Sequence, residues 1–150
     1  MLFEKQLSEL ELYISQLEKT NPKVSKSNVG WQIDHALRVL RGISWQLEES
    51  NPNEFKQKFN IKRKLFLMIG TIRRGTARVP KTVVNDKEIT EESIKIFLDK
   101  TKEQVKKIDD LPSKSHFIHP YLGSFDKKES IRFIEIHTEH HLKIIRDMFR

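Results

Sequence analysis

The chain has 150 residues, a mass of 17.8 kDa, 37% hydrophobic and 33% charged residues, and a formal net charge of +7. This length suits one domain with its own core, and no apolar run approaches the roughly 20 residues of a membrane span, so we expect no membrane partner. The chain contains no cysteine, which excludes disulfide frameworks, thiolate metal sites and a cysteine nucleophile, and leaves His, Asp and Glu as potential metal ligands.

Helical periodicity begins near the N-terminus. Apolar residues recur every three or four positions from Phe3 to Leu17, and the Asn21-Pro22 pair ends this stripe. Acidic residues interrupt the stripe, which is unlike the continuous apolar segment of a secretory signal, so we expect a cytoplasmic protein. The same periodicity predicts a second helix over Val29–Glu49.

The pattern weakens between the second helix and residue 90. A dense apolar run at residues 65–69 predicts a short or broken helix within 55–72, and residues 73–89 are expected to form a long connection. Residues 77–84 carry the only strand signal, which Pro80 interrupts.

The C-terminal half predicts two further helices. Thr90 has the side chain of an N-cap, acids follow it, and Lys106 and Lys107 lie at the other end of that helix, as the helix dipole favours. Residues 111–124 are predicted to be a loop, and residues 126–149 the last helix. Four main helices with a long connection between the second and third predict an all-α, four-helix-bundle fold in a single domain over residues 1–150.

The last helix contains the most informative residues, His137 and His141. Their spacing of four places both imidazoles on one helix face, one turn apart. At about 100° per residue, both fall in the apolar sector that contains Ile134 and Ile144. A metal ion would satisfy two buried imidazoles, but bonds to backbone carbonyls, bonds to each other, or a wet cleft would also do so. His140 falls at the edge of this sector, where we expect a supporting or surface role.

His35 is the candidate third ligand, because it is the only other histidine inside a main predicted helix. It lies off the aliphatic stripe of that helix, in line with Trp31 and Val39, so a purely structural role is the alternative. Four arginines could bind an anionic substrate or be solvated surface charges: Arg38, Arg41, Arg73 and Arg74.

At these histidines the sequence resembles the DinB-like (YfiT-like) superfamily of metal-binding four-helix bundles. That superfamily has one His in its second helix and His-x-x-x-His in its fourth, where this chain has Trp31-Gln-Ile-Asp-His35 and His137-Thr-Glu-His-His141. The chain is also similar to a branch with His-Pro-aromatic-x-Gly and His-Thr-x-His-His-Leu motifs, which match His119-Pro-Tyr-Leu-Gly123 and the segment from His137 to Leu142.

The resemblance implies a divalent metal such as zinc, nickel or manganese, held by His35, His137 and His141. It also implies a hydrolase or a thiol S-transferase, acting on a small-molecule substrate. Because the chain has no cysteine, a thiol reaction would use a low-molecular-weight thiol as cosubstrate. His119 and Tyr121 are expected either to border the pocket or to cap the last helix. No separate general base is assignable.

Two other classes of function stay open. The basic cluster around residues 56–64 and the pI near 9.6 favour nucleic-acid binding, but no zinc-finger, RRM or KH signature is present and the aromatic residues follow core periodicity. A nucleic-acid partner is therefore disfavoured. A non-catalytic helical bundle, which could be a homodimer, is the remaining alternative.

Overall fold

The structure is a computed structural model that describes residues 1–75 and 88–150, and it is mostly helical with one small sheet. The weak strand signal at 77–84 lies outside the described residues. The helices and strands are α1 (Glu4–Leu12), α2 (Val29–Glu49), α3 (Ile61–Ile69), α4 (Glu91–Lys106), β1 (His116–His119), β2 (Gly123–Asp126) and α5 (Lys127–Met148). Short 3-10 turns cover Ile14–Gln16, Pro52–Glu54 and Lys107–Asp110.

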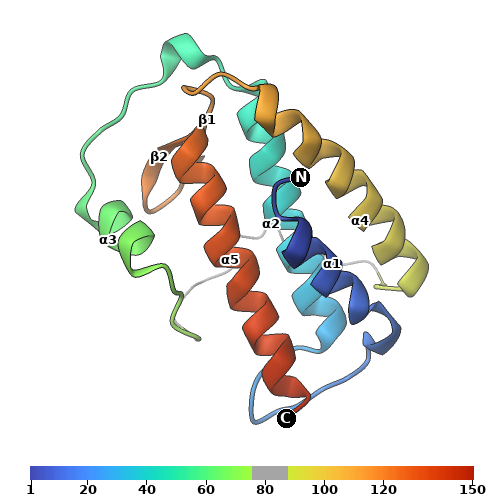
Figure 1. Cartoon of the computed structure of the whole chain (residues 1–150). Coiled ribbons are helices and arrows are strands. Elements are labelled where there is room, and N and C mark those ends of the chain that lie inside the picture. The colour runs from blue at the N-terminus through green and yellow to red at the C-terminus, as the bar shows by residue number, and fades with distance from the viewer. Residues whose placement is uncertain (76–87) are drawn as a thin grey trace.

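Helices α1, α2, α4 and α5 lie side by side around one core (Figure 1). Helix α2 contacts both α4 and α5, and α1 contacts the same two helices. The core includes the entire apolar stripe predicted near the N-terminus, namely Phe3, Leu7, Leu10, Ile14 and Leu17. The predicted first helix is nevertheless shorter than its stripe, because the α-helix ends at Leu12 and a 3-10 turn continues the apolar contacts.

Side-chain caps explain where the long helices α2, α4 and α5 begin. Asn28, Thr90 and Asp126 each accept a hydrogen bond from the backbone amide three residues further on. Each side chain satisfies an amide that has no partner within its helix. The predicted bounds of α2 and the predicted N-cap at Thr90 are confirmed.

The prediction of a loop over residues 111–124 is wrong from residue 116 onwards, where two short strands occur. The same strands show that the prediction of an all-α fold is wrong in this region. Strands β1 and β2 pair antiparallel as a hairpin, with Phe117 opposite Phe125. Both rings are buried, while Ile118, the residue after Phe117, is 64% exposed. Gly123 closes the turn with a φ of +76°, a conformation that side chains with a Cβ rarely adopt. The alternation covers only four residues per strand, too few for a periodicity signal.

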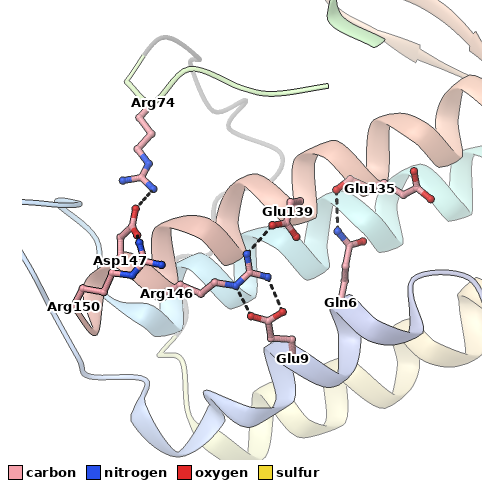
Figure 2. Close-up of polar contacts among 8 residues, drawn as sticks. All are labelled: Gln6, Glu9, Arg74, Glu135, Glu139, Arg146, Asp147 and Arg150. Carbon is pink, nitrogen blue, oxygen red and sulfur yellow. Dashed lines mark hydrogen bonds and ion pairs between the residues drawn. The ribbon is translucent and has the colours of Figure 1, made fainter. Parts of the chain in front are cut away.

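Polar contacts also join α1 to α5, as Figure 2 shows. The guanidinium of Arg146 lies between Glu9 on α1, which it contacts through two nitrogens at 2.6 and 2.7 Å, and Glu139 on its own helix at 2.7 Å. The Gln6 side-chain amide donates to the carbonyl of Glu135 at 3.0 Å. These contacts hold α5 in register against α1.

Helix α3 lies outside this group of packed helices, beside α5 (Figure 1). Asn60 caps its first turn, and Gly70 ends it in the left-handed conformation with a φ of +67°. A Cβ at Gly70 would also come within 2.7 Å of the Arg132 guanidinium. Within the described ranges, no helix combines the length and the apolarity needed to cross a bilayer.

Candidate metal centre

The three histidines predicted from the sequence converge at the contact between α2 and α5. His35 comes from α2, and His137 and His141 come from consecutive turns of α5. One potential ligand nitrogen from each of the three lies within 4.8 Å of the others. The ring centroids of His137 and His141 are 4.7 Å apart. The ring centroid of His35 lies 4.8 Å from that of His141 and 5.2 Å from that of His137.

Aromatic side chains line two sides of this cluster. Trp31, one turn before His35 on α2, stacks on its ring with centroids 4.9 Å apart and an angle of 8° between the planes. Phe133, one turn before His137 on α5, stacks on that ring at 6.0 Å and 14°. His35 and His141 are buried, and His137 is partly exposed. The three imidazole rings therefore lie in an apolar surrounding that is more open to solvent at His137.

The surroundings keep two of the imidazoles neutral. Burial lowers the pKa of His137 and of His141 well below 6.5, and charge on the neighbouring histidines lowers both further. Both rings are consequently neutral near pH 7, so each has one N–H and one nitrogen with a free lone pair. A neutral imidazole is the form that binds a metal ion.

Gln32, which is not among the site residues predicted from the sequence, determines which nitrogen of His141 is available to a metal ion. Its Oε1 lies 2.6 Å from Nδ1 of His141, while its Nε2 donates to Oγ of Ser25 at 3.1 Å. Because Oε1 can only accept, Nδ1 of His141 carries the proton and Nε2 carries the lone pair. Such an outer hydrogen bond typically orients a metal-binding histidine. No sequence signal distinguishes Gln32 from other helical glutamines.

His137 has an unsatisfied nitrogen. Its Nδ1 is buried and has no hydrogen-bonding partner among the described residues. A buried polar atom without a partner is costly, so its presence calls for a ligand such as a cation or a water molecule. This unpartnered nitrogen, with the imidazoles of His35 and His141 beside it, fits a metal site.

His140 contacts the cluster from outside. Its ring meets that of His141 edge-on, with centroids 5.1 Å apart, and it is half-buried. Burial lowers the pKa of His140, and the charge of Arg74 lowers it further, whereas a hydrogen bond with the backbone of Ile72 raises it. This place at the edge of the cluster fits both roles expected for His140, a supporting one and a surface one.

His119 caps a turn, but not the start of the last helix. Its Nδ1 accepts hydrogen bonds from the amides of Tyr121 and Leu122 at 3.1 and 3.2 Å, so it holds the turn of the hairpin. The cap of α5 is Asp126 instead. The Tyr121 side chain is 70% exposed.

Arg38 and Arg74, which are both candidate anion ligands, form ion pairs. Arg38 contacts Asp34 at 2.7 Å, and Arg74 contacts Asp147 at 2.6 Å (Figure 2). The guanidinium groups of Arg38 and Arg41 both lie over the ring of Phe97. These contacts favour a structural role for Arg38 and Arg74 over the binding of an anionic substrate.

No protein-family model, curated protein or solved structure matches the chain. The resemblance to the DinB-like superfamily therefore stays a prediction, and function has to be argued from the geometry of the site.

Proposed function

We propose that the chain is a divalent-metal-dependent enzyme of the hydrolase or low-molecular-weight-thiol S-transferase type, built on a DinB-like four-helix bundle. His35, His137 and His141 would hold the metal. The observation that carries this proposal is the convergence of three imidazoles from two helices, with ligand atoms within 4.8 Å of one another. Three imidazole ligands suit zinc or nickel, and the resemblance adds manganese.

Three protein ligands leave a coordination position open, as catalytic metal sites do. When bound there, a divalent ion would supply Lewis acidity, which lowers the pKa of a coordinated water or thiol. The buried nitrogen of His137 and the neutral state of His137 and His141 support this use of the residues.

The surrounding side chains have definable tasks in this proposal. Gln32 holds His141 in the tautomer with a free Nε2, and Trp31 and Phe133 restrict the movement of two ligand rings and exclude water from their faces. His137 is the most exposed of the three ligands, so a small substrate would approach on its side. A thiol reaction would draw its thiol from solution, because the chain has no cysteine.

Metal content tests the first half of the proposal. Protein purified without a histidine tag should bind one zinc, nickel or manganese ion per chain, and His137→Ala or His141→Ala should abolish this binding. His116→Ala is the matched control, because the ring of His116 packs on Phe55 and does not belong to the cluster. Binding that survives in all three ligand variants, His35→Ala included, would refute the site.

Turnover tests the second half. Ester, amide, epoxide and haloalkyl substrates should be screened with and without a low-molecular-weight thiol, using wild type, His35→Ala and chelator-treated protein. Metal-dependent turnover that His35→Ala removes supports the proposal. Tight metal binding without turnover would favour the non-catalytic bundle, and salt-sensitive DNA binding without metal would favour the basic-surface alternative.

A further inference from the structure

Helix α3 packs against the core with the partly buried side chains of Phe66 and Leu67. Its buried side chain is a cation, Arg63, which is 1% exposed. The guanidinium donates to the carbonyls of Leu122 and Lys58 at 3.3 and 2.9 Å and lies 3.5 Å from the carboxylate of Glu129. The helix is thus attached to the hairpin and to α5 through the polar contacts of Arg63, and also to α5 through the ring of Phe66, which lies 5.3 Å from that of Phe133 between centroids.

The opposite face of α3 is apolar and open to solvent. The exposed fractions are 55% for Ile61, 43% for Leu65, 75% for Met68 and 62% for Ile69, and Phe59, just before the helix, is 75% exposed. At about 100° per residue, the four helical side chains share a sector about 100° wide. We call these five residues the α3 apolar face.

Lysines border this face on both sides. Lys62 and Lys64 are exposed and flank the apolar sector on the helix, and the exposed Lys56 and Lys58 precede it. No acidic residue occurs from residue 55 to residue 75. All charged residues near the α3 apolar face in the sequence are therefore cationic. This charge favours an anionic partner.

We propose that the α3 apolar face docks on an anionic lipid bilayer, with the helix lying in the plane of the interface. An apolar stripe flanked by lysines is typical of helices that lie on membranes: the apolar side chains enter the acyl region, and the lysines extend to the headgroups. A second copy of this chain would fit less well, because it would bring two lysine clusters together. The sequence-based expectation of no membrane partner rested on the lack of a spanning segment, which surface docking does not need.

The chain offers a clean labelling experiment, since it has no native cysteine. Met68→Cys and the control Leu12→Cys, an equally exposed site on α1 at 76%, each take one environment-sensitive fluorophore. Vesicles of equal parts phosphatidylglycerol and phosphatidylcholine should shift the emission of the label at 68 to the blue and leave the label at 12 unchanged. Equal shifts at both sites, or none at 68, would overturn the proposal.

Charge and apolar contributions can be separated by vesicle co-sedimentation. A lysine near an anionic surface contributes about fivefold in binding, so Lys62→Glu/Lys64→Glu should weaken binding by at least about 25-fold. The control Lys100→Glu/Lys106→Glu makes the same charge change on α4 and should have a much smaller effect.

Leu65→Gln/Met68→Gln removes apolar surface without changing charge and should also weaken binding. Wild-type affinity in that variant would mean charge adsorption alone, and no vesicle binding combined with self-association through this face would mean a second copy. Either result refutes the proposal.

Discussion

Replacing Gln32 by leucine tests how the site is organised. The change removes the acceptor 2.6 Å from Nδ1 of His141 at a position that is only 3% exposed, so no solvent can replace the lost bond. The buried Nδ1–H then lacks a partner, which costs about 1–3 kcal/mol of folding free energy. His141 also loses the interaction that favours the tautomer with Nε2 free. Loss of such an outer hydrogen bond typically reduces metal affinity by about 10–100-fold, or about 1.4–2.7 kcal/mol.

Isothermal titration with zinc measures the affinity, and urea unfolding of the metal-free protein measures the folding free energy. Gln32→Glu keeps an acceptor for Nδ1 and should retain most of the affinity. Gln104→Leu is the matched control, because it removes a 2.6 Å bond from α4 to Glu48 on α2 without touching the cluster. Wild-type zinc affinity in Gln32→Leu, while His141→Ala binds none, would refute the positioning role and leave the metal site intact.

Three further predictions concern stability. Because the pKa values of His137 and His141 lie well below 6.5 in the folded protein, the unfolded chain binds protons first as the pH falls. The free energy of unfolding of metal-free protein should therefore be highest above pH 6.5 and fall below it by up to about 1.4 kcal/mol per pH unit for each histidine; a flat urea-unfolding profile from pH 7 to 5 would contradict this. Arg63→Leu should cost about 3 kcal/mol in urea unfolding, because Glu129 and two carbonyls lose their buried donor. Thr90→Ala should cost about 1 kcal/mol, seen as a lower Tm, through loss of the α4 cap.

Periodicity and caps predict α2, α4 and α5 well, since each is long and one of its faces is apolar. The same reasoning does not tell which face of a short helix meets the protein. The α3 apolar face points outwards, while the inward side of this helix combines Phe66 and Leu67 with the cation Arg63. Carbonyls of the chain around Arg63 and a carboxylate of α5 provide the partners of its guanidinium. Leu122 and Glu129 are remote from Arg63 in the sequence, so local patterns contain no information about them.

The candidate site, too, could be predicted from the sequence only in part. The spacing of His137 and His141 predicts that they share a face. His35 is the third candidate because it lies in a main predicted helix, and the resemblance supports it although it lies off the aliphatic stripe of that helix. The structure brings the three rings together. Gln32 could not be predicted, because its role depends on how α2 is rotated against α5, and that rotation is determined by packing.

The cluster joins segments that are far apart along the chain: the bond between Gln32 and His141 spans 109 residues. Its halves therefore meet only after α2 and α5 have docked, a step that requires closing a long loop. An ion that recognises all three imidazoles binds the native state and not the unfolded chain, so it raises the free energy of unfolding by mass action. If the cluster forms after the folding transition state, added metal would slow unfolding and leave the folding rate unchanged. The metal would then stabilise the assembled helices kinetically, because it would slow their separation.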